Sequence, residues 1–528
     1  MNKQVNGIVP LVDIAPAKQA FTGDIVIGKD VLELLTGAMY TDPLSVFREY
    51  IQNSTDAIDD AITNNTYSKS NIIPQIHINL DVSARSILIR DNGLGVSNNN
   101  FKRILTSIGG SHKRGTHHRG FRGVGRLSGL GYCQEVVFRS RSLGDEFISE
   151  LRWDARRLKT LLNDSDWEGD LKDIVKEVAT FTKFKNDKFP THFFEVELNK
   201  VLRFKNDILL NEEVVRKYIS EICPVPFSSD FKYGDQISNF LSEHGVGQTY
   251  GVFINGTSDQ IYRPHSNSFN YKQDHKDSFD SIDLFKLEGI NGEIDAIGWK
   301  LEHGYFGALP KPLGLHGIRL RSGNTQVGSA EIVNEIFPET RFNSWTVCEV
   351  QVLNSKIIPN GRRDHFEQNA HFMNLVGQLA PLGKQVAHQC RYNSSKRNNL
   401  KVFELEKSKA GEIIEIVEHK ATPAKVIKKS KEEFILAIDK MKKVISMDYF
   451  NEKEKENLKS EVAKLEENFI SVPDSINEPK ELSFLPKGQQ VISNEIFELI
   501  YDNYSSNKNA AKTLIDKLVK QLAARYNV

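Results

Sequence analysis

The sequence predicts an α+β protein that begins with a two-layer α/β sandwich, continues into an α/β middle domain and ends in an α-helical region. Three observations support this prediction. An amphipathic helix pattern precedes a pair of short alternating strand patterns. A Gly-rich segment then leads into further strands. Near the C-terminus, apolar residues recur at three-to-four spacing on a charged background. A helix layer packed on a mainly antiparallel sheet fits the first part of this order.

The elements of the sandwich follow from local patterns. Residues 30–64 predict helices, the second with Asp42 as N-cap and Pro43 in its first turn. The segments "QIHINLDV" and "SILIRD" predict two strands joined by a tight turn. Residues 92–131, rich in Gly, Ser, His and Arg, predict a long functional loop or lid. Strand patterns return at 135–142, 146–153 and 192–201.

The rest of the chain predicts two further parts. Residues 206–395 combine a helix pattern, "NEEVVRKYISEI", with short strands such as "TYGVFING" and "EIDAIGWKL". Residues 396–528 predict amphipathic helices interrupted by a Pro-bearing linker at 471–488. We therefore predict three domains, at 1–205, 206–395 and 396–528.

Composition excludes several classes of protein. Lys plus Arg equals Asp plus Glu at 69 each, so no global positive field attracts the chain to nucleic acid. The four cysteines lie far apart without a CxxC pair, which argues against both a zinc site and a disulfide framework. Because no signal-peptide pattern or long apolar run occurs, we expect a cytoplasmic protein that does not span a membrane.

The segment "FREYIQNSTDAIDD" carries three polar side chains on one helical stripe. Glu49, Asn53 and Asp56 are spaced i, i+4 and i+7, so they point the same way. A solvated helix face would also show such residues. Phe47 and Ile51 supply a competing apolar face, which favours a stripe that lines a site.

Two glycine motifs follow. "DNGLG", Asp91 to Gly95, ends a predicted strand and by itself is an ordinary turn signal. "GFRGVGRLSGLG" places glycines at 120, 123 and 125 before a helix or turn. Backbone N–H groups in such a turn can bind phosphates, although glycines also serve ordinary packing.

The order and spacing of these three motifs resemble the GHKL ATPase superfamily, which includes the ninety-kilodalton heat-shock chaperones, gyrase-type topoisomerases, MutL, MORC proteins and histidine kinases. The resemblance covers roughly residues 25–205, and "FREYIQNSTDA" is most similar to the chaperone branch. It implies a GHKL (Bergerat) fold, a transducer-like middle domain, and ATP hydrolysis with Mg²⁺.

The resemblance also implies roles for individual residues. Glu49 would be the general base for the attacking water, and Asn53 would bind Mg²⁺. Asp91 would accept a hydrogen bond from the adenine amino group. Asp56 would be a structural partner within the helix. Backbone groups complete the expected ATP site, at Gly93 and Gly95 beside the base and at Gly120, Gly123, Val124 and Gly125 beside the phosphates.

The lid and a later strand contribute further expected contacts. Lys113 or Arg114 would add positive charge near the phosphates. His112, His117 and His118 lack metal-ligand spacing, so a lid fits better than a metal site. Thr191 falls at the position where members of the family make a water-mediated contact to adenine, and Pro190 stands where the family has glycine.

The middle part carries a candidate phosphate sensor in "IIPNGRRDHFE". The family's middle domains send a basic residue to the γ-phosphate, and here Arg363 is the preferred candidate, with Arg362 as the alternate. A surface β-turn with arginines would look the same in sequence.

Four functions compete. The favoured one is an ATP-driven conformational machine of the chaperone type, which closes a lid and works as a homodimer on a client protein. The alternative is a MORC- or MutL-like ATPase that acts on DNA, such as occurs in bacterial defence systems; nucleic acid is thus the less favoured partner. A histidine kinase fits poorly because its nucleotide domain normally comes last. Glu49 argues against a scaffold that binds ATP without turnover.

Overall fold

A computed structural model of the chain describes residues 42–69, 73–109, 123–256, 258–272, 275–471, 480–505 and 507–526. The chain divides into two compact units. The first comprises Met1–Glu302, Leu309–Asn334 and Thr346–Leu379, and the second comprises His303–Ala308, Glu335–Trp345 and Ala380–Val528. The helix predicted near residue 30 and the lid residues Lys113, Arg114 and Gly120 lie outside the described residues.

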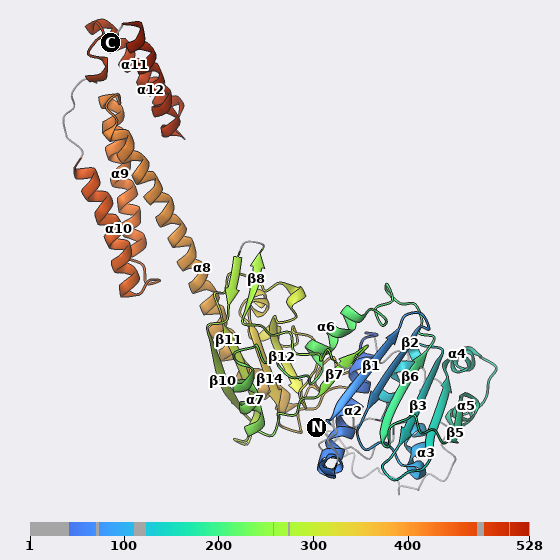
Figure 1. Cartoon of the computed structure of the whole chain (residues 1–528). Helices are drawn as coiled ribbons and strands as arrows, with labels where there is room; N and C mark the ends of the chain where they lie inside the picture. The colour runs from blue at the N-terminus through green and yellow to red at the C-terminus, as the bar shows by residue number, and fades with distance from the viewer. Residues whose placement is uncertain are drawn as a thin grey trace, which may run out of the picture. The chain divides into compact units, whose positions relative to one another are not determined.

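Seven strands form the first sheet, in the order β5-β4-β3-β6-β2-β1-β7 (Figure 1). They are β1 Gln75–Asp81, β2 Ser86–Asp91, β3 Glu135–Arg141, β4 Ile148–Asp154, β5 Ala179–Phe184, β6 Phe193–Asn199 and β7 Gly251–Ile254. Only the β1–β7 pair is parallel among these neighbours. The mainly antiparallel sheet and the tight pair made by β1 and β2 are confirmed.

Helices pack on one face of this sheet. They are α2 Ser45–Thr63, α3 Asn98–Thr106, α4 Ala155–Asn163, α5 Leu171–Val178 and α6 Glu212–Ile222. Along β1, Ile76, Ile78 and Leu80 join the core beneath the helices, whereas His77 and Asn79 alternate with them toward the other face. The predicted two-layer sandwich is confirmed.

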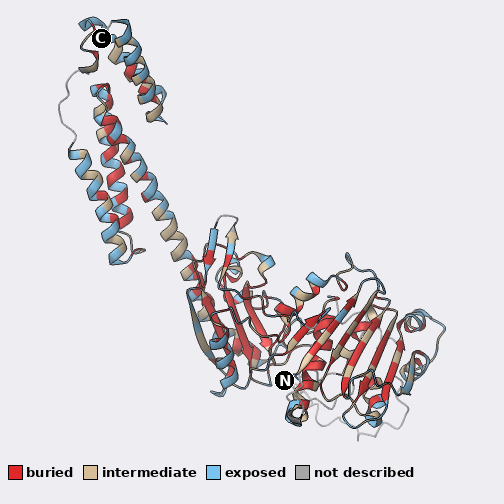
Figure 2. Ribbon diagram, viewed as in Figure 1, coloured by how far each residue is buried: buried red, intermediate tan, exposed pale blue. Residues whose placement is uncertain are grey.

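The face of the sheet without helices is charged. Arg139 on β3 forms ion pairs with Glu150, Glu195 and Glu197, and these partners lie on the neighbouring strands β4 and β6. Such cross-strand pairs stabilise this face of the sheet. Figure 2 shows the contrast between mostly buried strands and helices that are only partly buried.

Two local predictions need correction. The helix α2 begins at Ser45 and not at Pro43, because residues 42–44 form a turn in which the Asp42 carboxylate accepts from the Leu44 N–H at 3.1 Å. The segment 92–131 is not a loop throughout. Its residues 98–106 form α3, in which Phe101 and Leu105 are buried, and residues 125–131 form the 3₁₀ helix η4.

A second sheet follows within the first unit, in the order β10-β11-β14-β12-β13. Its strands are β10 Ser281–Glu288, β11 Ile294–Glu302, β12 Gly317–Ser322, β13 Thr325–Gln326 and β14 Val347–Val352; nearby lie α7 Gly234–Glu243 and the hairpin of β8 Ser268–Lys272 and β9 His275–Ser278. Trp299 of β11 and Ile237 of α7 share its core. The α/β character predicted for this part is confirmed.

The second unit is mainly helical. It contains the later part of α8 Ala370–Glu418, together with α9 Ala424–Ile445, α10 Glu452–Ile470, α11 Lys487–Asn503 and α12 Lys508–Arg525. The rings of Phe434 and Phe469 stack 3.9 Å apart between α9 and α10. Asn451 caps α10 in a reciprocal pair with Glu454. The helical C-terminal region is confirmed.

Short 3₁₀ helices complete the described secondary structure: η3 Thr66–Lys69, η5 Lys311–Leu313, η6 Asn334–Ile336, η7 Thr340–Trp345 and η8 Lys480–Leu482. The domain boundaries stay a prediction. Strand β7 joins the first sheet although it lies beyond residue 205, and α8 continues unbroken through residue 395.

All four cysteines are buried. None of the helices that the structure describes combines the length and the apolar character needed to span a bilayer.

Candidate functional site

Helix α2 supplies one wall of the candidate site. Its apolar residues pack under the sheet, where Phe47 and Ile51 are wholly buried. The polar stripe is also withdrawn from solvent: Glu49 is 7% exposed, Asp56 is 0% exposed and Asn53 is half-buried. A solvated helix face therefore does not describe these residues.

Glu49 lies between two arginines. Its Oε1 is 3.1 Å from Nη2 of Arg48 and 3.7 Å from Nε of Arg363. Arg48 also donates to the backbone carbonyl of Arg362 at 3.1 Å, whereas the Arg362 side chain is exposed. Of the two candidate sensors, Arg363 is the one whose guanidinium reaches Glu49. Arg48 is a site residue that the sequence analysis missed, although it directly precedes Glu49.

The loop that carries Arg363 is a tight hairpin. Its ends pair as an isolated bridge between Pro359 and Phe366, and the Asn360 N–H donates to the His365 carbonyl at 2.8 Å. Arg363 has a φ of 56°, in the left-handed region that side chains other than glycine rarely adopt. Its carbonyl accepts from Gly328 at 2.9 Å, which helps to hold this conformation. Strained backbone of this kind concentrates at functional sites.

The glycine turn meets α2 at Glu49. A Cβ at residue 125 would lie closer than 3.0 Å to Oε2 of Glu49, so any side chain there would force this carboxylate to move. The hydroxyl of Tyr50 holds the turn in place, because it donates to the Arg126 carbonyl at 3.0 Å and accepts from the Gly129 N–H at 3.1 Å. The glycine turn and the helix therefore form one rigid corner.

A positively charged side chain, that of Arg126, follows Gly125 in the glycine turn. The Arg126 guanidinium donates to the Ser107 carbonyl, and burial lowers the pKa of Arg126 to about 10. It stays protonated at neutral pH. Gly123 has a φ of 72°, which a glycine adopts without strain, and Val124 is buried.

The Asp91 turn packs against the later part of α2. Asp91 is 2% exposed and accepts from the Gly93 N–H at 3.0 Å. A Cβ at residue 93 would lie 2.7 Å from the backbone carbon of Ala57, and a Cβ at residue 95 would overlap the carbonyl oxygen of Arg141. Both glycines are thus required by packing against α2 and β3, whether or not a ligand is bound.

Thr191 and His192, which follow Pro190, differ in exposure. Thr191 is exposed, whereas the neighbouring His192 is buried and its Nδ1 lies 2.8 Å from the Gly93 carbonyl. The ring of Tyr67 lies 6.4 Å from that of His192. Burial, reinforced by the charges of Asp91 and Asp59, raises the pKa of the Tyr67 hydroxyl. The polar character of His192 beside Thr191 was the sequence signal that could have identified it.

Two amides on α2 have no hydrogen-bond partner among the residues that the structure describes. Gln52 is 1% exposed, and neither atom of its amide has a hydrogen-bond partner. Asn53, next along the chain, makes no side-chain hydrogen bond to the residues that the structure describes. Amide oxygens and carboxylates are hard ligands that suit Mg²⁺. The chemistry of this stripe therefore fits the magnesium ion of a nucleotide.

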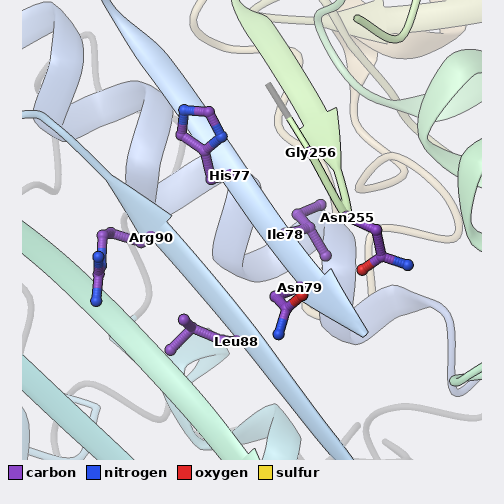
Figure 3. A pocket seen from close by; sticks show the side chains of 7 residues that line it. All are labelled: His77, Ile78, Asn79, Leu88, Arg90, Asn255 and Gly256. Carbon is purple, nitrogen blue, oxygen red and sulfur yellow. The ribbon is translucent and has the colours of Figure 1, made fainter. Parts of the chain in front are cut away.

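A separate cavity of about 230 Å³ lies on the charged face of the sheet, and His77, Asn79 and Arg90 are among its lining residues (Figure 3). Their side chains alternate with the buried residues that face α2. This cavity is therefore distinct from the site around Glu49.

Comparisons with known proteins relate the first part of the chain to a family of ATPases. Residues 40–181 match the family described as "Histidine kinase-, DNA gyrase B-, and HSP90-like ATPase". The chain is 26% identical over 141 residues to chaperone protein HtpG of Hydrogenovibrio crunogenus, covering 24% of this chain and 22% of that protein. It is 25% identical over 249 residues to chaperone protein HtpG of Dechloromonas aromatica, covering 44% and 36% respectively. The matched segments span between about a fifth and just over a third of these relatives.

Proposed function

We propose that this chain binds ATP with Mg²⁺ and hydrolyses it to ADP and phosphate, because residues 40–181 match the family of histidine kinase-, DNA gyrase B- and HSP90-like ATPases. We propose further that hydrolysis drives a conformational cycle of the chaperone type. The relatives from Hydrogenovibrio crunogenus and Dechloromonas aromatica, both called chaperone protein HtpG, support this choice over an activity on DNA.

The observation that carries the proposal is the position of Glu49. A buried carboxylate meets a glycine turn on one side and the Arg363 guanidinium on the other. This arrangement suits phosphoryl transfer, in which a carboxylate orients water and an arginine stabilises the charge of the transition state. Glu49 would act as the base and Arg363 as the phosphate sensor.

The remaining contacts have defined roles in the proposal. Asn53 would hold Mg²⁺, and backbone N–H groups of Gly123, Val124 and Gly125 would bind phosphate oxygens. Asp91 would accept from the adenine amino group, which selects ATP over GTP. Lys113 and Gly120 would complete the phosphate contacts, and Thr191 would reach adenine through water.

The conformational cycle would use the rest of the chain. Lid closure over the triphosphate would bring Arg363 to the γ-phosphate, and the chain would work as a homodimer. Helix α11 offers a surface for self-association, since Ile492, Ile496 and Leu499 are 58%, 46% and 61% exposed. Their spacing of i, i+4 and i+7 places them on one face.

Three variants of the full chain test the site. Glu49→Ala should bind ATP with wild-type affinity and lose turnover, because only the base is removed. Asp91→Asn should fail to bind, since the new amide presents a donor to the adenine amino group. Arg363→Ala should bind normally and turn over at least about tenfold more slowly. Arg362→Ala is the matched control and should leave turnover unchanged, as its side chain is exposed.

Binding is measured by titration with a fluorescent ATP analogue, and turnover by phosphate release with and without duplex DNA. Wild-type turnover in Glu49→Ala would refute the base assignment. Equal rates in Arg363→Ala and wild type would remove that arginine from the site. Stimulation by DNA that weakens with rising salt would favour the DNA-acting alternative.

A further inference from the structure

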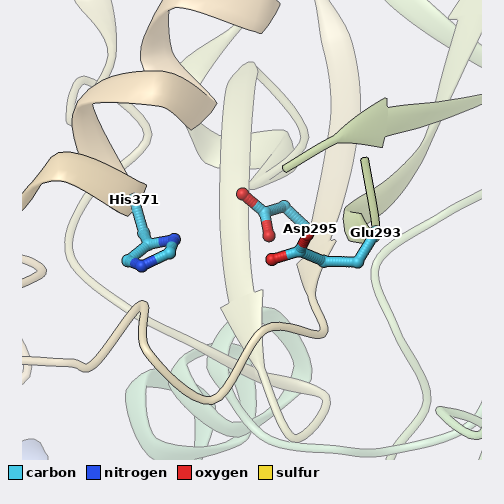
Figure 4. A group of neighbouring side chains, drawn as sticks. All are labelled: Glu293, Asp295 and His371. Atoms are coloured by element: carbon cyan, nitrogen blue, oxygen red, sulfur yellow. The ribbon is translucent and has the colours of Figure 1, made fainter. Parts of the chain in front are cut away.

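A group of metal-ligating side chains lies outside the proposed ATP site, at one end of the second sheet. Glu293 directly precedes β11, Asp295 is the second residue of β11, and His371 is in the first turn of α8. One ligand atom from each lies within 4.8 Å of the other two. Figure 4 shows the side chains of Glu293 and Asp295, from the start of β11, near the side chain of His371 from α8.

The carboxylate at the centre of this group is buried without a compensating charge. Asp295 is 0% exposed, and its Oδ1 accepts from the Asn354 amide. Its Oδ2 has no hydrogen-bond partner within the described segments of the chain. Nδ1 of His371 is likewise buried and unpartnered. Burying an ionised carboxylate is costly unless a cation or several donors neutralise it.

The surroundings offer neutral donors in place of cations. The Glu293 carboxylate accepts from the Asn291 N–H at 3.1 Å and lies 3.5 Å from the amide of Asn354. Across the described part of the chain, no Lys or Arg forms an ion pair with Glu293 or Asp295. Two carboxylates and an imidazole thus converge without a positive charge.

The backbone around the group is fixed. The carbonyl of Asp295 accepts from the N–H groups of Leu353 and Asn354 at 2.8 and 3.1 Å. A Cβ at residue 289 would lie 2.5 Å from Oδ1 of Asp295, so glycine is needed there to leave room for this carboxylate. On the helix side, the Asn374 amide donates to the Glu288 carbonyl at 2.9 Å, which ties the start of α8 to the end of β10. Ligands held in this way are preorganised for an ion.

We propose that Glu293, Asp295 and His371 bind a divalent transition-metal ion, for which Zn²⁺ is the best match. An imidazole with two carboxylates suits zinc, whereas Mg²⁺ and Ca²⁺ prefer ligand sets made of oxygen alone. Three protein ligands leave a fourth position for water. The ion fastens the β10–β11 hairpin to the first turn of α8, and this role is independent of ATP hydrolysis.

The experiment uses the full chain, stripped with a chelator and titrated with ZnCl₂ against a chromophoric zinc indicator. The wild type should bind about one Zn²⁺ per chain, and its melting temperature should rise on binding. Asp295→Asn and His371→Gln should each weaken zinc binding by at least about 100-fold. His388→Gln is the control, because His388 is exposed on the same helix.

The same variants exclude loss of folding as the explanation. In the absence of zinc, Asp295→Asn should melt no lower than the wild type, since it removes an uncompensated buried charge and keeps the shape of the side chain. The rise in melting temperature with zinc should then be absent from Asp295→Asn and from His371→Gln, and present in His388→Gln. The proposal is overturned if the wild type binds no stoichiometric zinc, or if Asp295→Asn and His371→Gln bind it as well as His388→Gln does.

Discussion

The substitution Gly125→Ala tests the corner between α2 and the glycine turn. A methyl group at this position falls on Oε2 of Glu49, about 1 Å short of the 3.4 Å at which ordinary contact begins. The atom in the way is the end of a flexible side chain, and residue 125 has a negative φ that alanine adopts readily. The fold should therefore survive, while the carboxylate must move.

A displacement of about 1 Å at a reacting group costs on the order of 100-fold in rate. We therefore expect kcat for ATP hydrolysis to fall about 100-fold in Gly125→Ala, which corresponds to about 2.7 kcal/mol of transition-state stabilisation. The melting temperature should change little. Steady-state phosphate release at saturating ATP, together with thermal melting, measures both quantities.

Gly377→Ala provides the matched control, because a Cβ at residue 377 of α8 would meet no described atom within 4 Å apart from the neighbouring backbone of its own helix. This variant should keep wild-type turnover. If Gly125→Ala, folded and saturated with ATP, hydrolysed it within about twofold of the wild-type rate, the position of Glu49 would not matter for catalysis. The reasoning from the glycine turn to the base would then be wrong.

Two further predictions concern the rest of the chain. Burial lowers the pKa of His265 from 6.5 to about 3. Between these two pH values His265 is protonated in the unfolded chain and neutral in the folded chain, so the stability of the fold decreases as the pH falls. At pH 5.5 this loss of stability is roughly 1 kcal/mol. The melting temperature of His265→Phe should therefore depend less on pH than that of the wild type, whereas the control His388→Phe should show the wild-type pH dependence. If His265→Phe and the wild type had the same pH profile of melting temperature, the reasoning would be contradicted. Ile496→Glu places a charge on the exposed apolar face of α11 and should shift the chain from dimer to monomer in light scattering, whereas Lys487→Glu on the same helix should not. An oligomeric state unaffected by Ile496→Glu would count against this face.

Much of the first sheet could be predicted from sequence because its signals are local. The alternation of β1 and β2 and the amphipathic pattern of α2 each follow from residues within one element. The resemblance to the GHKL superfamily, inferred from three motifs, is confirmed by the family match over residues 40–181. The helix α3 was missed because glycine- and asparagine-rich flanks surround its short apolar pattern.

Contacts between distant segments could not be predicted in the same way. The pairing of β7 with β1 joins residues that are far apart in the chain, and no local pattern encodes it. Arg48 donates a hydrogen bond to the carbonyl of Arg362, which lies 314 residues later in the sequence. Likewise, Glu293 and His371 belong to segments without a metal-binding motif, so only the fold brings them together.

The glycine motifs that suggested the family also show how a sequence signal can have two causes. Gly93 and Gly95 are required because the Asp91 turn packs closely against Ala57 and Arg141, and this requirement holds without a nucleotide. These two glycines are therefore evidence for the fold and not for a bound nucleotide. Gly125 is different, since the group that excludes a side chain there is the carboxylate of Glu49. A protein that kept only the packing would need the first two glycines and would tolerate alanine at the third, once Glu49 was replaced by a smaller residue. Adding Gly125→Ala to the variant Glu49→Ala tests whether this glycine serves the fold or the carboxylate of Glu49. If it serves the carboxylate alone, the added Gly125→Ala change should lower neither the stability nor the ATP affinity of the Glu49→Ala variant. An additional loss of either would mean that Gly125 serves the fold as well as the base.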